Sequence, residues 1–261
     1  MLSKLLKNDL KKNMRWMWIL FVSAILVSLL ARGCSELGAN ISFFKVLSIF
    51  LDTVFYSLIA NCIIHPFLRS FLNFTKSIYG DESYLTHTLP VTKNQIINSK
   101  FLTALIEILL GFVCVISALL IRFASADFFT IIELLLSTLI SGKFSTFLVI
   151  ALIVLLIIVE FLMFISIIFF SIVKAYKSKE KKVLKSFLIT GLMSFIALTI
   201  LAVVMLVVML INGVDLTSNI IVLSSSALYS LIISGIVVYS AVIIVFYYLT
   251  KREFNKGVNV D

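Results

Sequence analysis

The sequence predicts an all-α membrane protein with six transmembrane helices. The mean hydropathy is +1.16, and 61% of the residues are hydrophobic while 13% are charged. Six apolar stretches are long enough to cross a bilayer, and the basic residues gather in alternate links between them. This composition excludes a soluble globular domain. No link is long enough for a soluble catalytic domain, so we expect residues 1–261 to form a single transmembrane domain.

Each predicted span approaches or exceeds the ~20 apolar residues that cross ~30 Å of hydrocarbon. The first is short and is expected to rely on flanking Trp and Arg side chains. Pro66, near the inner end of the second span, should kink it because proline removes a helix hydrogen bond. The six spans lie at about 16–31, 46–68, 101–122, 146–173, 187–211 and 227–250.

The distribution of basic residues predicts the topology. Of 22 Lys and Arg residues, 18 fall in four polar segments that six spans place on one side, and four (Arg32, Lys45, Arg122 and Lys143) fall on the other. Basic residues favour the cytoplasmic side, so both termini should be cytoplasmic. The net charge of +9 therefore reflects topology, and we expect no nucleic-acid partner. The four segments are 4–15, 69–100, 174–185 and 251–256.

The first polar segment predicts an amphipathic elbow helix. Leu2, Leu5, Leu6 and Leu10 recur at helical spacing among lysines, and Trp16 and Trp18 follow at the depth of the membrane interface. This pattern favours a helix lying on the cytoplasmic leaflet before the chain turns into the first span. A frayed basic tail is the alternative.

The second polar segment, 69–100, contains the strongest local signals. Thr92 and Gln95 have the spacing of a capping box, which predicts a helix start at Thr92. Pro90 disfavours helical geometry at Leu89 and so separates that helix from what precedes it. The mixed composition of 74–88 predicts a short surface helix and a turn.

The run GDESYLTHTLPVT from Gly80 to Thr92, followed by Lys100, resembles the loop between the second and third spans of ATP-binding-cassette (ABC) transporter type-2 permeases. In that family the loop forms a coupling helix that sits in a groove of a separate ATP-hydrolysing subunit. The sequence departs from the family pattern at Ser83, where glycine is usual, and at His87, where an aromatic residue is usual.

The resemblance implies the permease subunit of a bacterial ABC exporter in the cytoplasmic (inner) membrane. Tyr84 and Leu85 would anchor the loop in the ATPase groove, and Asp81 and Glu82 would meet basic residues there. A second permease subunit and membrane lipid are the other implied partners. We expect amphipathic peptides or lipid-like compounds as cargo. The implied coupling residues are Asp81, Glu82, Tyr84, Leu85, Thr86, Leu89, Pro90 and Thr92.

The chain has no P-loop, so ATP and Mg²⁺ are expected on the partner subunit and no cofactor or metal on this chain. Its two histidines, His65 and His87, stand outside any metalloprotease or serine-protease pattern, so we expect no catalytic centre of its own. A membrane scaffold or immunity-type protein that binds a toxic peptide without moving it is a further alternative.

Three acids fall within predicted spans: Asp52, Glu107 and Glu160. A carboxylate at the centre of a membrane span costs ~2.5–3.5 kcal/mol on an insertion scale, so such groups face protein or a watery cavity. They are candidates for a substrate pathway, or packing residues held by hydrogen bonds. A role in a pathway supports the alternative function, an ATP-independent ion- or proton-coupled transporter or channel.

Two further patterns predict local structure. Residues 127–143 are apolar but charged at intervals, and we expect an external interfacial or re-entrant helix there, because a seventh span would place the basic segment 174–185 outside. Ser226, Ser230 and Ser234 form a stripe of small residues that lets helices approach closely, either within the subunit or in a dimer.

Overall fold

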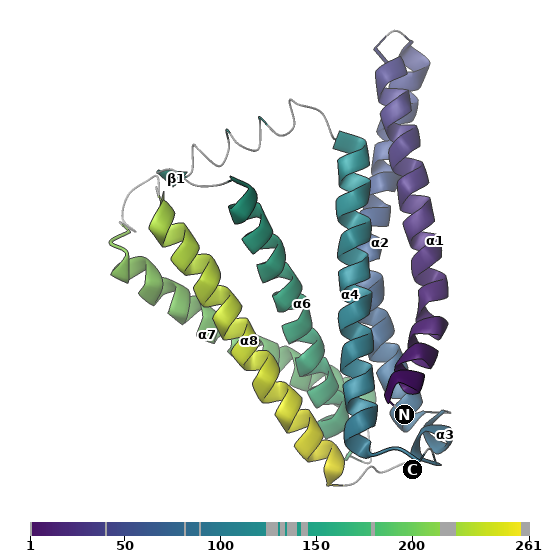
Figure 1. Ribbon diagram of the computed structural model, residues 1–261, viewed down its shortest axis with the longest axis vertical. Coiled ribbons are helices and arrows are strands. Elements are labelled where there is room, and N and C mark those ends of the chain that lie inside the picture. Colours follow the sequence, from purple (N-terminus) through teal and green to yellow (C-terminus); the bar gives the residue numbers. More distant parts are fainter. Residues whose placement is uncertain are drawn as a thin grey trace. The chain divides into compact units, whose positions relative to one another are not determined.

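Six long helices make up most of the part of the chain that the structure describes (Figure 1). The computed structural model describes residues 2–39, 41–80, 82–88, 90–123, 130, 134, 140–141, 146–178, 181–214 and 223–256. All six helices are long and apolar enough to cross a membrane, which confirms the predicted spans and indicates a multi-pass membrane protein. They are α1 (Leu2–Leu37), α2 (Ser42–Tyr79), α4 (Lys93–Phe123), α6 (Thr146–Ala175), α7 (Lys182–Ile211) and α8 (Ser225–Asn255).

Three short elements complete the described structure. The helix α3 (Ser83–Thr88) lies between α2 and α4 in the chain. The two-residue strands β1 (Ile140–Ser141) and β2 (Leu223–Ser224) pair in parallel. Apart from these two strands, the described residues are helical or lie in turns and links, as predicted. The predicted external helix at 127–143 lies almost entirely outside the described residues.

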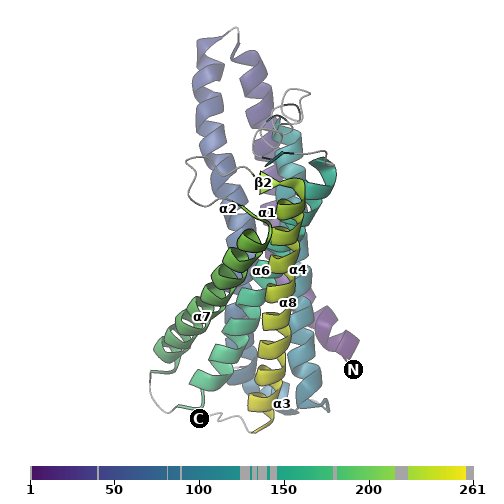
Figure 2. The ribbon, with the colours of Figure 1, turned by 90° about the vertical axis from the view of Figure 1, so that its left-hand side faces the viewer.

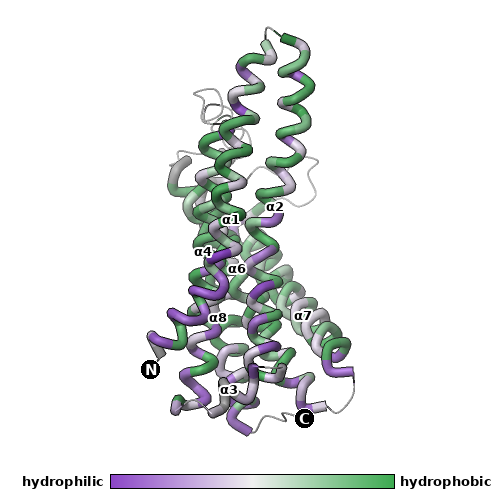
Figure 3. The backbone as a smooth tube through the Cα atoms, turned by 90° about the vertical axis from the view of Figure 1, so that its right-hand side faces the viewer, coloured by the Kyte–Doolittle hydropathy of each residue, from purple (hydrophilic) through white to green (hydrophobic). Residues whose placement is uncertain are grey.

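The first two helices extend well beyond their predicted spans. The helix α1 has 36 residues and α2 has 38, so each is about 55 Å long at 1.5 Å per residue, against ~30 Å of hydrocarbon. The basic amphipathic segment and the first span are both parts of the continuous helix α1. Hydrophilic residues mark its N-terminal end (Figure 3). An elbow lying on the membrane surface stays a prediction.

The second helix differs from its prediction at its C-terminal end. Residues 74–79, expected in the short surface helix, are the last turns of α2. Phe74 and Ile78 lie four residues apart on one face and are fully buried, so burial favours continuing the helix. Lys76 in the last turn also interacts favourably with the helix dipole. The helix continues through Pro66 without a break.

The chain divides into two units, which we describe separately. Unit 1 comprises residues 1–74 and 90–129, and unit 2 comprises residues 75–89 and 130–261. In unit 1, α1 packs along α4, and a core forms around buried residues of three helices, including Ala24, Phe55 and Cys114. The prediction of a single domain stays a prediction.

A close crossing of α2 and α4 lies in this core. A Cβ built on Gly111 would stand 2.8 Å from the carbonyl oxygen of Cys62 and 3.3 Å from the Pro66 ring. Pro66 has no N–H, so the usual helical donor to that carbonyl is missing. The thiols of Cys62 and Cys114 lie 3.4 Å apart and share a hydrogen bond. Glycine at position 111 therefore lets α4 approach the proline site of α2.

In unit 2, α6, α7 and α8 pack against one another (Figure 2). Their core includes Met163, Ala197 and Tyr239. The predicted serine stripe of α8 contacts α7: Asn212 Nδ2 donates to Ser230 Oγ at 3.0 Å, and the Ser234 hydroxyl lies 3.7 Å from Met205 Sδ. Ser230 and Ser234 of the stripe thus pack within the subunit, and use of the stripe in a dimer stays a prediction.

Candidate functional site

The end of α2 is a tight turn at Gly80. The Gly80 amide donates to the carbonyls of Thr75 (3.1 Å) and Lys76 (3.2 Å), and the Gly80 carbonyl accepts from Ser83 N at 2.9 Å. A Cβ at Gly80 would lie 3.0 Å from the Cα of Lys76. A larger residue at this position would crowd the backbone of the last turn of α2.

Two side chains at the start of the short helix α3 differ sharply in exposure. Ser83 is buried, whereas Tyr84 beside it is 75% exposed. Glu82 lies half-buried in the turn before the helix, and Pro90 after it is exposed. An exposed tyrosine ring is a typical anchor for a protein partner.

We call residues 74–89, which are predicted to bind the ATPase, the coupling segment. Of these, 75–89 belong to unit 2. The ring of Tyr79 stacks on that of Tyr176, just beyond the end of α6, with centroids 4.4 Å apart and planes at 27°. The Lys182 ammonium at the start of α7 lies 5.8 Å from the centre of the Tyr176 ring. This aromatic contact joins the coupling segment to the C-terminal end of α6 and the N-terminal end of α7.

The start of α4 confirms the predicted capping box. Gln95 N donates to Thr92 Oγ1 at 3.3 Å, and Thr92 N donates to Gln95 Oε1 at 3.2 Å. Reciprocal bonds of this kind satisfy two amides that have no partner within the helix. They fix where the chain, after leaving the coupling segment, becomes α4.

The other predicted coupling residues are described only in part. Asp81 and Leu89 lie outside the described residues. Leu85 and Thr86 are placed in the backbone of α3, as is His87. Of the predicted coupling residues, the structure describes the side chains of Glu82 and Tyr84 in unit 2 and of Pro90 and Thr92 in unit 1.

Comparison of the chain with protein-family models, curated proteins and solved structures found no match. Any functional conclusion therefore depends on the chain's own residues and their geometry, and on the local resemblance of Gly80–Thr92.

Glu107, one of the three intramembrane acids, lies in a polar cluster where α1, α2 and α4 meet. Its side chain is 1% exposed, and its carboxylate accepts from Asn13 Nδ2 and, at 3.5 Å, from Ser70 Oγ. The Asn13 carbonyl oxygen accepts in turn from Asn73 Nδ2 at 2.6 Å and from Arg69 Nε at 3.5 Å. A buried carboxylate held in this way is part of the packing of unit 1.

The same end of unit 1 contains a largely buried ion pair. Lys100 Nζ lies 3.0 and 2.9 Å from the two carboxylate oxygens of Asp9, and their side chains are 8% and 16% exposed. Ser99 Oγ adds a longer bond to Asp9 at 3.4 Å. The pair ties the N-terminal part of α1 to the base of α4.

Asp52 forms a bidentate ion pair with Arg122. Nε lies 2.8 Å from Oδ1 and a terminal guanidinium nitrogen lies 3.0 Å from Oδ2. Arg122 also reaches Ser35 Oγ at 3.4 Å. Arg122 and Glu107 are 15 residues apart in α4, about 22 Å along the helix. Asp52 and Glu107 thus do not share one site in unit 1.

Glu160 lies at mid-length of α6 in unit 2. Its side chain is half-buried, and its carboxylate interacts with the hydroxyl of Tyr239 on α8. Tyr239 is 4% exposed. Within the described residues, no group of three His, Cys, Asp or Glu side chains could hold a metal ion.

Several of these partners were not predicted from the sequence. Asp9 and Asn13 are four residues apart on one side of the amphipathic helix, and this polar pair opposite the exposed lysines could have indicated a buried face. Tyr176 carries no local signal, because its role depends on a ring 97 positions earlier in the chain.

Proposed function

We propose that this chain is the permease subunit of an ABC exporter, and that the coupling segment is where a separate ATPase subunit binds. The observation that carries the proposal is the short helix α3, which holds the exposed Tyr84 between a glycine turn and a capped helix start. The resemblance of Gly80–Thr92 to the type-2 permease loop supports the same assignment.

The contacts of the segment suggest how ATP hydrolysis would move the membrane helices. A displacement of α3 by the ATPase would reach α6 and α7 through Tyr79 and Tyr176, which are in direct contact. It would reach α4 through the chain at Thr92, whose cap resists fraying of the helix start. Displacement of the loop would thus displace the helices connected to it.

In the proposed assembly, two permease subunits, identical or related, pair with two ATPase subunits that bind ATP and Mg²⁺. An even number of spans places both termini on one side, and the basic segments favour the cytoplasm of a bacterial inner membrane. The N-terminal part of α1 would be the elbow at that surface. Amphipathic peptides or lipid-like compounds remain the proposed cargo.

Purification in mild detergent from native membranes tests the proposal. We expect a P-loop ATPase subunit to co-elute in stoichiometric amount, and function to stop when ATP hydrolysis in that subunit is abolished by mutation. If the protein elutes alone and works in ATP-depleted vesicles under a proton gradient, the exporter assignment is wrong, and Glu160 becomes the first candidate for proton coupling.

A further inference from the structure

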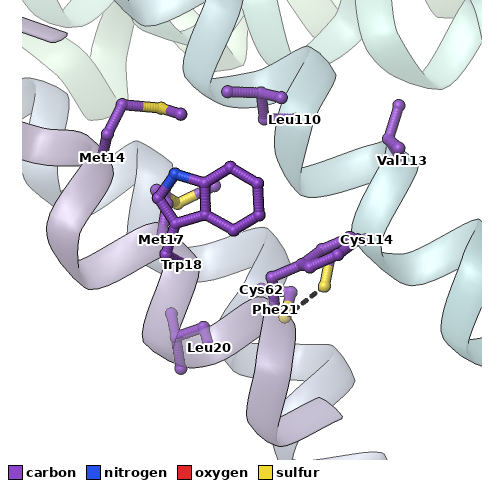
Figure 4. A pocket seen from close by; sticks show the side chains of 9 residues that line it. All are labelled: Met14, Met17, Trp18, Leu20, Phe21, Cys62, Leu110, Val113 and Cys114. Atoms are coloured by element: carbon purple, nitrogen blue, oxygen red, sulfur yellow. Dashed lines mark hydrogen bonds between the residues drawn. The ribbon is translucent and has the colours of Figure 1, made fainter. Parts of the chain in front are cut away.

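A pocket of about 200 Å³ lies between α1 and α4 in unit 1 (Figure 4). Trp18 and Met14 of α1 line it on one side, Leu110 and Val113 of α4 on the other, and the thiol of Cys62 comes from α2. The pocket is open at the surface, since Trp18 and Val113 are both 57% exposed.

The lining determines what can occupy the pocket. All nine lining residues carry hydrocarbon, aromatic or sulfur side chains. The volume is several times the roughly 30 Å³ of one water molecule. A buried water needs two to four polar partners, however, and this lining lacks them. An apolar chain is therefore the favoured occupant, and the surrounding bilayer supplies acyl chains.

The charges beside the pocket select among lipids. Lys7, Lys11, Met14 and Trp18 are spaced i, i+4, i+7 and i+11, so the two lysines continue the face of α1 that carries the pocket. Both lysines are exposed, as is Arg15. Lys11 precedes Trp18 by about 10 Å along the helix, a distance that suits a headgroup above a buried chain. Basic groups at this depth attract anionic headgroups.

We propose that this pocket binds one acyl chain of an anionic phospholipid, whose headgroup contacts Lys7 and Lys11. The lipid is a resident of unit 1 and not the exported cargo. It fills the groove between α1 and α4, next to the Cys62–Cys114 contact. The site does not depend on the ATPase partner, so the lipid proposal can be tested separately from the exporter proposal.

The chain has two tryptophans, Trp16 and Trp18, so Trp16→Phe leaves Trp18 as the only reporter in the pocket. The full-length Trp16→Phe protein is reconstituted in bilayers of phosphatidylcholine and phosphatidylglycerol in equal parts. Bromine, a short-range quencher of Trp fluorescence, is placed on the acyl chains of one lipid or the other. We expect brominated phosphatidylglycerol to quench Trp18 more strongly than brominated phosphatidylcholine.

Filling the pocket distinguishes a bound lipid from lipid gathered near a basic surface. In the Trp16→Phe background, Val113→Phe should remove the excess quenching, and Leu110→Phe is a second filling variant in case the first fails to fold. Leu109→Phe, at an exposed α4 position outside the lining, should retain the excess quenching.

Lys7→Gln with Lys11→Gln should remove the preference for phosphatidylglycerol. Equal quenching by both lipids, or excess quenching that persists in folded filling variants, would overturn the proposal.

Discussion

The rings of Tyr79 and Tyr176 stack 4.4 Å apart, one at the end of α2 and the other just past the end of α6. Both residues belong to unit 2, and Tyr79 precedes the first residue of α3 by four positions in the chain. This pair is therefore a direct contact between the proposed ATPase-binding segment and the helices of unit 2.

Loss of this stack should separate binding from coupling. Tyr176→Leu removes an aromatic pair worth about 0.5–1.5 kcal/mol, and leaves Tyr84 unchanged. We expect the ATPase still to co-purify, while transport per ATP hydrolysed falls severalfold in reconstituted vesicles. Tyr176→Phe, which keeps the ring, is the control and should behave as wild type. Equal transport efficiency in the Leu and Phe variants would show that the stack plays no part in coupling.

The crossing at Gly111 predicts a difference between two glycines. Gly111→Ala places a Cβ within 2.8 Å of the Cys62 carbonyl oxygen and should destabilise the protein by about 1–3 kcal/mol. Gly191→Ala, where nothing lies within 4 Å, should be neutral or stabilise α7 by up to about 1 kcal/mol. Thermal unfolding in detergent measures both. A Gly111→Ala protein as stable as Gly191→Ala would contradict the close helix crossing.

The largely buried pair of Asp9 and Lys100 predicts strong coupling between the two residues. Lys100→Met alone leaves the Asp9 carboxylate without its cation and should cost about 3–5 kcal/mol. The double variant Asp9→Leu with Lys100→Met should recover most of this loss, because no buried charge remains. Lys93→Met, at an exposed position in the first turn of α4, is the control. Additive losses in a double-mutant cycle of thermal stability would argue against the pair.

The ion pair of Asp52 and Arg122 predicts that Asp52 stabilises unit 1 and does not contact substrate. Asp52→Asn with Arg122→Gln removes both charges and should preserve ATP-driven transport, with a modest loss of stability. Arg122→Gln alone should lower stability more, since Asp52 is then unpaired. If transport by a stable double variant is abolished, Asp52 belongs to the substrate pathway after all.

The spans and the cap were predictable because their causes are local. A bilayer demands runs of apolar residues, and a capping box needs only Thr92 and Gln95. Hydropathy could not give the full length of α2, whose last turns are held by burial of Phe74 and Ile78. Nor could it find Asp9 opposite Lys100, 91 residues away, because such partners depend on how helices pack. The docking role of the coupling segment was predicted from a family resemblance. The contact of Tyr79 with Tyr176 was visible only in the structure.

The most direct test of the exporter assignment is whether Tyr84→Ala abolishes binding of the ATPase subunit. Tyr84 is 75% exposed, so its removal should leave the fold intact while the anchor of the docking surface is lost. Tyr248→Ala, which removes a ring 65% exposed on α8, is the matched control. We predict that the ATPase co-purifies with wild type and Tyr248→Ala but not with a monodisperse Tyr84→Ala protein. Unchanged ATPase binding by Tyr84→Ala would contradict docking through α3.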